Sequence, residues 1–102
     1  MSGPTQPATL NEEWSDERVR SWLEVRPYDE TPVDYWILLK AYEAMLPEHF
    51  ERFMVYFLEA GHDLNTRNQK GETILDRISR HAQSAAFVEI LQRSGARSSR
   101  EL

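Results

Sequence analysis

The chain has 102 residues, of which 40% are hydrophobic and 28% are charged, as in a soluble globular domain with a small core. The absence of cysteine excludes disulfides, thiolate catalysis and cysteine-ligated zinc. No apolar run reaches the roughly 18–20 residues of a membrane span. Residues 1–7 have neither the basic nor the apolar region of a secretory signal. We therefore expect a soluble protein of the reducing cytoplasm, with no membrane as a partner.

The formal net charge is −5, from 12 Lys and Arg against 17 Asp and Glu, which argues against nucleic acid as a partner. Residues 1–60 hold most of the acidic side chains, whereas residues 61–102 are net positive. Such asymmetry can steer a partner or favour head-to-tail self-association. A basic cluster in the second part lacks interleaved aromatics, so we expect it to face an acidic protein surface or water. Its members are Arg77, Arg80, His81, Arg93, Arg97 and Arg100.

The two ends of the chain lack the periodicity of a folded element. Residues 1–11 predict a disordered N-terminal tail, and residues 96–102 predict a frayed C-terminal tail. Residues 12–95 then form a single domain. Its first helix is predicted from about Ser15 to Val25, because Ser15 is a favourable N-cap and the proline at 27 disfavours helix in the residue before it.

Two helices in close succession follow a loop at residues 27–32. Thr31 is predicted as the N-cap of the first, with Pro32 in the first helical position. Apolar residues surround much of this helix, which predicts a central position covered on more than one side. Pro47 begins the next helix so soon that the two should form an antiparallel hairpin, which Gly61 closes. The predicted buried stripe of the later helix is Phe50, Phe53, Met54, Phe57 and Leu58.

A polar, turn-rich segment at residues 62–72 separates this pair from two more helices. Thr73 is predicted to cap a helix that runs to about His81. Ser84 is predicted to cap the last helix, which Gly95 closes. The side chains predicted to be buried here are Ile74, Leu75, Ile78, Ala85, Phe87, Val88, Ile90 and Leu91.

The helix pairs indicate a repeat, because Gly61 and Gly95 close two apolar helices at a spacing typical of stacked helical repeats. From Leu58 to Leu75, and again from Phe87 to Ala96, the chain resembles the ankyrin-repeat family. The family pattern of Gly, x-Asp-apolar-Asn and Asp/Asn-x-x-Gly-x-Thr is matched by Gly61, Asp63, Leu64, Asn65, Asn68, Gly71 and Thr73. The resemblance implies an all-α, ankyrin-like stack of antiparallel helix pairs, about five helices, with a short projecting turn at 62–72. Tetratricopeptide repeats share the period but do not explain this linker.

The departures from the family pattern limit the match to about two to two and a half repeats. Ile74 replaces the usual proline and Asp76 the usual histidine, and residues 32–61 match mainly in their second helix. In this family, partner proteins bind to the turn tips and the inner helix face. The resemblance therefore implies a non-catalytic protein-protein interaction module. Carried over by position, its binding residues are Arg67, Gln69, Lys70, Glu72, Arg80 and His81, with Tyr35 and Glu43 from the upstream unit.

No arrangement of residues predicts an enzyme, a metal site or a cofactor. The three histidines lack the spacing of a metal-binding pair. Ser79, Asp76 and His81 do not share one helix face, as a hydrolytic triad on this helix would require. Asp76 and Arg80 are instead spaced as a surface ion pair. The glycines are isolated, so no phosphate-binding loop is expected.

Two alternative functions remain open from the sequence. A stack of fewer than three repeats can leave an apolar end exposed, which a second copy would cover in a homodimeric structural or regulatory protein. The acidic half can instead occupy a basic enzyme site, as in a small acidic inhibitor or immunity-type protein. The residues expected to carry that inhibition are Glu12, Glu13, Asp16, Glu17, Asp29 and Glu30.

Overall fold

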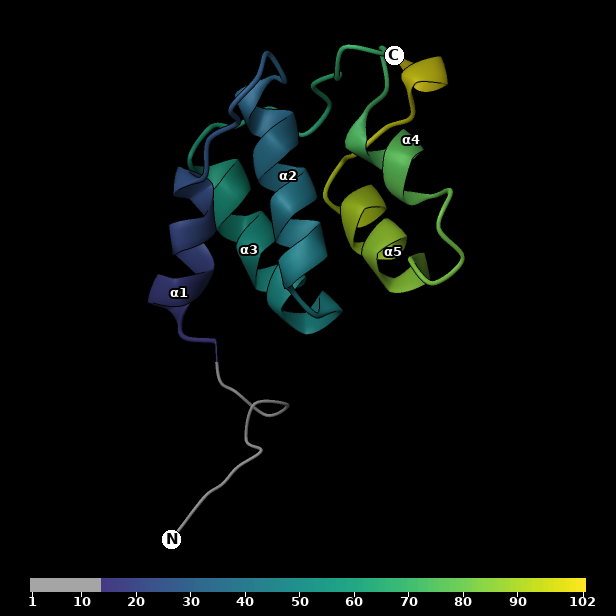
Figure 1. Cartoon of the computed structure of the whole chain (residues 1–102). Coiled ribbons are helices and arrows are strands. Elements are labelled where there is room, and N and C mark those ends of the chain that lie inside the picture. The colour runs from purple at the N-terminus through teal and green to yellow at the C-terminus, as the bar shows by residue number, and fades with distance from the viewer. Residues whose placement is uncertain (1–13) are drawn as a thin grey trace, which may run out of the picture.

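The computed structural model describes residues 14–102, which form five α-helices and two short 3-10 helices without a strand (Figure 1). The predicted all-α fold is thereby confirmed for this part of the chain. The predicted disordered tail, residues 1–11, lies outside the described residues. None of the helices in the described part has both the length and the apolar composition needed to cross a bilayer.

Helix α1 (Asp16–Ser21) begins where the sequence predicts, because the Ser15 hydroxyl accepts the Arg18 N–H at 3.0 Å. The chain then tightens into the 3-10 helix η2 (Trp22–Glu24) and becomes extended at Val25. Together the two elements cover the predicted helix at 15–25. Helix α1 packs against α3 through the buried Val19, so it covers one side of the helical body.

Helix α2 (Val33–Ala44) starts one residue later than predicted. Thr31 is not its cap, because the Thr31 N–H is bound to the Asp29 carboxylate at 2.9 Å and Pro32 is the extended residue before the helix. Contacts with η2, α3 and α4 confirm the predicted central position of α2. Its buried residues are Tyr35, Ile37, Leu38 and Ala41.

Helix α3 (Pro47–Glu59) follows α2 at once and carries most of the aromatic core. Phe50, Phe53 and Phe57 are fully buried, and Phe53 has its ring 6.1 Å from that of Phe50 and 6.0 Å from that of Phe57. The predicted stripe was one residue too wide, since Leu58 is 42% exposed. The rotation of about 100° per residue carries Leu58 past the edge of the buried face.

The second helix pair consists of α4 (Ile74–Ile78) and α5 (Ala85–Arg93). Thr73 caps α4 as predicted. The helix ends before His81, because the Ser84 hydroxyl donates to the carbonyl groups of Ile78 and His81 at 2.7 and 2.8 Å. Ser84 thus precedes α5 without capping it through its side chain. The prediction that Ala85 is buried is wrong, because it is exposed. Phe87 and Val88 are half-buried, which is less than predicted.

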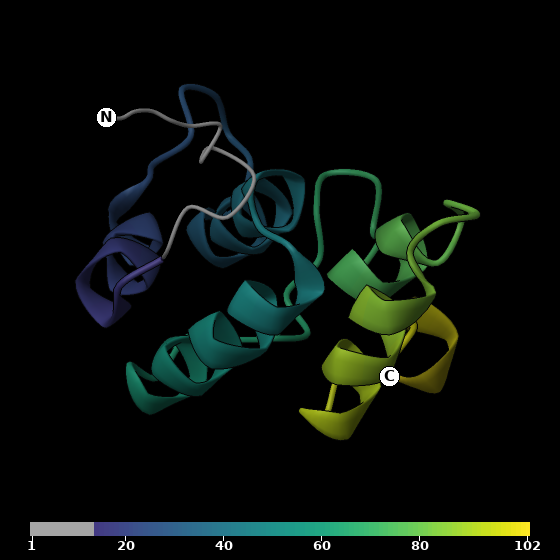
Figure 2. The same ribbon diagram turned by 90° about the horizontal axis from the view of Figure 1, so that it is seen from below.

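The two pairs lie against each other with corresponding helices in contact. Helix α2 contacts α4, and α3 contacts α5 (Figures 1 and 2). An aspartate in the first turn of each leading helix accepts a backbone N–H from the segment that follows its helix pair. Asp34 accepts the backbone N–H of Asp63, and Asp76 accepts that of Ser99, so each pair is closed by a bond back to its own start.

The C-terminal segment is folded onto α4, so the prediction that residues 96–102 fray is wrong. Ala96 is 6% exposed, and the chain ends in the 3-10 helix η3 (Ser99–Glu101). The Thr73 hydroxyl donates to the Arg97 carbonyl at 2.8 Å, and the Asn65 carboxamide accepts the Arg97 N–H at 2.7 Å. Composition alone predicted fraying because these bonding partners lie more than 20 residues upstream.

Replacing Gly61 with alanine should lower the free energy of unfolding by about 1–2 kcal/mol, because Gly61 has a φ of 83° that L-residues adopt only with strain. No atom lies near the added methyl group, so the cost comes from the backbone alone. Urea denaturation measures the loss. Gly61→Asn should lose less, since asparagine tolerates this conformation better. Equal losses for the two variants would contradict this explanation.

Candidate protein-binding surface

An open groove of about 580 Å³ lies between α2 and the segment that runs from residue 68 into and just beyond α4. We call it the α2–α4 groove. Its wall comes from the leading helices of both pairs and from the projecting turn between them, at the contact of α2 with α4. The residues that line it are Thr31, Tyr35, Trp36, Leu39, Asn68, Gln69, Lys70, Glu72, Arg77 and Arg80.

Asn68 organises the turn at the edge of the groove. Its carboxamide oxygen accepts the N–H groups of Lys70 and Glu72, each at 2.9 Å, and its own N–H donates to the Glu72 carbonyl at 2.8 Å. Gly71 has a φ of 81° and allows the chain to reverse within this short span. The turn is therefore held by its own hydrogen bonds and presents its outer side chains from a fixed backbone.

Tyr35 is a buried residue of the groove lining that holds the turn at Asn68. Its side chain is 2% exposed, and its hydroxyl accepts a hydrogen bond from the Asn68 side-chain amide at 3.1 Å. Tyr35 therefore lines the groove from an almost fully buried position, and its role in binding a partner stays a prediction. The hydrogen bond joins α2 to the turn.

The apolar wall of the groove comes from α2. Trp36 and Leu39 are half-buried, although the apolar residues around this helix predict a helix covered on more than one side. Tyr28, which is 89% exposed, meets the Trp36 ring edge-on with the centroids 5.3 Å apart. The Lys40 ammonium lies 4.6 Å from the centroid of the same indole.

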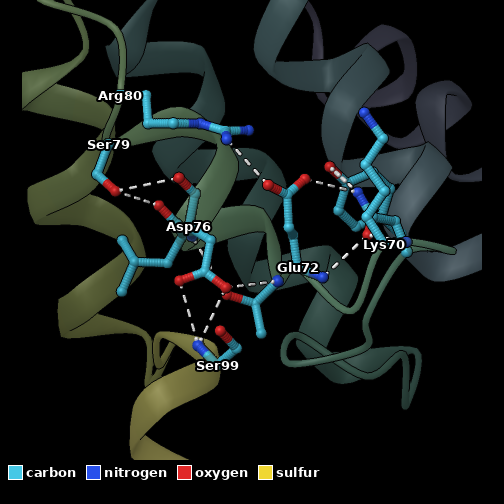
Figure 3. A network of polar contacts seen from close by, with 10 residues as sticks. Lys70, Glu72, Asp76, Ser79, Arg80 and Ser99 are labelled. Carbon is cyan, nitrogen blue, oxygen red and sulfur yellow. Dashed lines mark hydrogen bonds and ion pairs between the residues drawn. The ribbon is translucent and has the colours of Figure 1, made fainter.

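Glu72 is the acidic group of the groove, and Figure 3 shows its partners. The Asn68 amide donates to it at 3.1 Å, and the Arg80 guanidinium lies 2.9 Å away. The hydrogen bond from Asn68 and the charge of Arg80 hold the pKa of Glu72 below its usual value. The predicted ion pair between Asp76 and Arg80 is wrong, because Asp76 instead accepts the N–H groups of Thr73 and Ser99.

The structure brings five of the eight predicted binding residues to the groove, namely Tyr35, Gln69, Lys70, Glu72 and Arg80. Gln69 also accepts the Thr31 hydroxyl at 3.3 Å, which ties the turn to the start of α2.

The other three predicted binding residues lie outside the groove lining. The Arg67 guanidinium points to the Ser99 carbonyl at 3.5 Å, and Glu43 pairs with Lys40 at 3.3 Å. His81 stacks on Tyr42, whose hydroxyl lies 2.8 Å from the imidazole Nδ1. These contacts stabilise the surface around the groove without forming its wall.

The groups considered for chemistry have other partners. The Ser79 hydroxyl donates to the Leu75 carbonyl, while Asp76 and His81 are engaged as described above. Within residues 14–102, no three His, Asp or Glu side chains are grouped so that they could hold a metal ion. His49 is buried and stacks on Trp14 at 5.4 Å, away from the groove lining.

Comparison of the chain with protein-family models, with curated proteins and with solved structures found no match. The resemblance to ankyrin repeats, which rests on the motif at residues 58–75, therefore stays a prediction.

Proposed function

We propose that this chain is a non-catalytic protein-binding module and that the α2–α4 groove receives the partner. The observation that carries the proposal is the combination, in one groove, of a partly exposed Trp36 and Leu39 with the charged groups of Lys70, Arg77 and Arg80. Tryptophan and arginine are enriched among the residues that dominate binding energy at protein interfaces. Such a surface offers an apolar anchor point surrounded by groups that fix orientation.

The rigidity of the turn supports this proposal. The Asn68 side chain bonds three groups of Lys70 and Glu72, and its amide also reaches Tyr35 on α2. A surface that is ordered before binding loses little conformational entropy when the partner arrives. The side chains of Gln69 and Lys70 are exposed on this turn and are available for contact.

The proposal includes an ankyrin-like arrangement of the two helix pairs. Three observations support it: α2 contacts α4 and α3 contacts α5, Gly61 and Gly95 close the second helix of each pair with positive φ, and Asp34 and Asp76 perform equivalent bonding. In an ankyrin-like stack, the leading helices and the turn tips form the inner binding face. The α2–α4 groove lies at the corresponding place.

Site-specific photo-crosslinking in cells that naturally produce the chain tests the proposed function. A photoreactive side chain at Gln69, in the groove, should give a defined crosslink to one other protein. The same group at Glu89, an exposed residue of α5 outside the groove, serves as the matched control and should not. A purified fragment of the captured protein must then bind the isolated chain. Crosslinks that appear equally at both positions would contradict the proposal.

A homodimer is a second candidate, favoured by one observation on α3. Val55 is 53% exposed and Leu58 is 42% exposed one turn later, so two apolar side chains face outward together. Light scattering over a hundredfold range of concentration tests it. A mass near that of one 12.0 kDa chain at all concentrations rules out the dimer, and a mass near twice that value supports it.

Of the acidic residues that the inhibitor alternative would use, Glu17 and Glu30 are exposed, whereas two others already have partners within the chain. Asp16 is paired with Arg52 at 2.7 Å, and Asp29 binds the Thr31 N–H. Glu12 and Glu13 lie outside the described residues.

A further inference from the structure

We propose that the segment bound in the α2–α4 groove is an acidic stretch of another protein, with carboxylates that flank one apolar side chain. This inference rests on the proposed function and specifies the chemistry of the partner. It follows from the charges that line the groove, from the partners those charges already have, and from the apolar wall between them.

The groove is positive although the chain is negative. Lys70, Arg77 and Arg80 line it, and Glu72 is its single acidic side chain, whereas the whole chain has a net charge of −5. An acidic segment is therefore attracted to this groove and repelled by the acidic surface of residues 14–60. The contrast favours one docking position over the others.

Arg77 is the cation with most to gain from a carboxylate. Its side chain is half-buried against the groove, yet its guanidinium forms no hydrogen bond or ion pair with the described residues. The neighbouring Asp76 forms no ion pair with it, and both carboxylate oxygens of Asp76 instead accept backbone N–H groups at Thr73 and Ser99. A guanidinium presents paired donors that match a carboxylate.

Lys70 supplies a second cation at the turn; its charge acts on Glu72, but its side chain forms no hydrogen bond or close ion pair with the described residues. Only its backbone N–H is bonded, to Asn68, and its side chain is exposed beside the groove. Arg80 is already engaged by Glu72 at 2.9 Å, so it contributes less to an incoming acidic group. Lys70 and Arg77, whose side chains form no hydrogen bond or close ion pair with the described residues, thus define where the carboxylates of the partner should lie.

The apolar wall specifies the remaining part of the segment. Trp36 and Leu39 are partly exposed on one side of α2, and an aliphatic or aromatic side chain placed between the two carboxylates would cover them. Nucleic acid also carries negative charge, but Trp36 is the one partly exposed aromatic ring of the lining, and base stacking uses several. The observations therefore favour an acidic peptide over a nucleic acid.

Selection of short random peptides displayed on phage against the purified chain tests the inference. The selected peptides should be enriched in Asp and Glu around one large apolar residue. Titration calorimetry with a selected peptide should show weaker binding at high salt, because exposed charges are screened. Lys70→Glu and Arg77→Glu should each weaken binding roughly tenfold, since attraction is replaced by repulsion.

Arg97→Glu is the matched control, because it makes the same charge change at an exposed position outside the groove. It should leave the affinity within about twofold. Circular dichroism of each variant shows whether it is folded, and the exposed position of Lys70 makes that variant the safer of the two. In a second selection, the double variant Lys70→Glu/Arg77→Glu should prefer basic peptides.

The outcomes separate this inference from the proposed function. Selected peptides without acidic enrichment that still crosslink at Gln69 would overturn the acidic partner and leave the protein-binding groove in place. Peptides that bind without contact at Gln69 and are unaffected by Lys70→Glu would overturn both. Tighter binding of a single-stranded oligonucleotide than of any selected peptide would also overturn the inference, and would indicate a nucleic-acid partner.

Discussion

Replacing Phe53 with alanine should remove a large part of the free energy of unfolding. Phe53 is fully buried in the middle of α3, with its ring packed between those of Phe50 and Phe57. Removing a buried phenylalanine ring costs about 3–5 kcal/mol. The described part of the chain is small, and domains of this size have a total stability of about 5–10 kcal/mol. Urea denaturation followed by circular dichroism should therefore show a large fall in the transition midpoint.

The control for this change lies two residues further along the same helix. Val55 is 53% exposed, so Val55→Ala should change the free energy of unfolding by no more than about 0.5 kcal/mol. If both variants lost the same small amount of stability, α3 would not be the central core helix that the structure shows.

The second large effect is expected at Asp76, which holds two parts of the chain together. Its carboxylate accepts the Thr73 N–H within the capping box of α4 and the Ser99 N–H of the C-terminal segment. Loss of a cap costs about 0.5–2 kcal/mol, and an orphaned N–H adds to it, so Asp76→Ala should lose about 2–3 kcal/mol. The C-terminal segment should also detach, with faster tryptic cleavage at Arg97 and Arg100. Unchanged cleavage would contradict this account.

Asp76 also predicts how stability depends on pH. Burial alone would raise the pKa of Asp76, but the hydrogen bonds from Thr73 and Ser99 together outweigh it and lower the pKa below its ordinary value of 3.8. A carboxyl group whose pKa is lower in the folded state stabilises the fold above its unfolded pKa. This contribution is lost as the pH falls through the folded pKa.

The stability advantage of the natural chain over Asp76→Asn should therefore be full above about pH 5 and shrink as the pH falls through the acid range. Denaturation series at several pH values measure it. The pKa values of Asp16, Asp29 and Glu72 are also lowered, so both proteins should lose stability in acid. An advantage that stays constant across the acid range would show that Asp76 acts by shape alone.

The helix ends were predictable because their signals are local. Ser15 and Thr73 bind backbone N–H groups three residues away, and Gly61 and Gly95 adopt the positive φ that ends a helix. Pro47 likewise begins α3 as predicted. Each of these residues acts within one helical turn, so both partners of the interaction can be recognised in a short stretch of sequence.

The groove was only partly predictable because it depends on contacts between distant residues. Asn68 and Tyr35 meet across 33 positions, and their bond holds the turn against an almost fully buried residue of α2. The spacing of Asp76 and Arg80 predicted an ion pair between them. Arg80 instead forms its ion pair with Glu72, and Asp76 accepts the Ser99 N–H. Helical periodicity could not show that Trp36 lines a groove, because core and groove positions share the same apolar pattern.

Amide chemical-shift mapping of the isotope-labelled chain, during titration with a selected acidic peptide, is the most direct test of the α2–α4 groove as the partner-binding surface. The structure predicts shifts concentrated at Gln69, Lys70 and the indole N–H of Trp36, with the α3 residues Val55 and Leu58 unchanged. Shifts confined to Val55 and Leu58 would contradict the account, because they would place the interface on the exposed apolar face of α3.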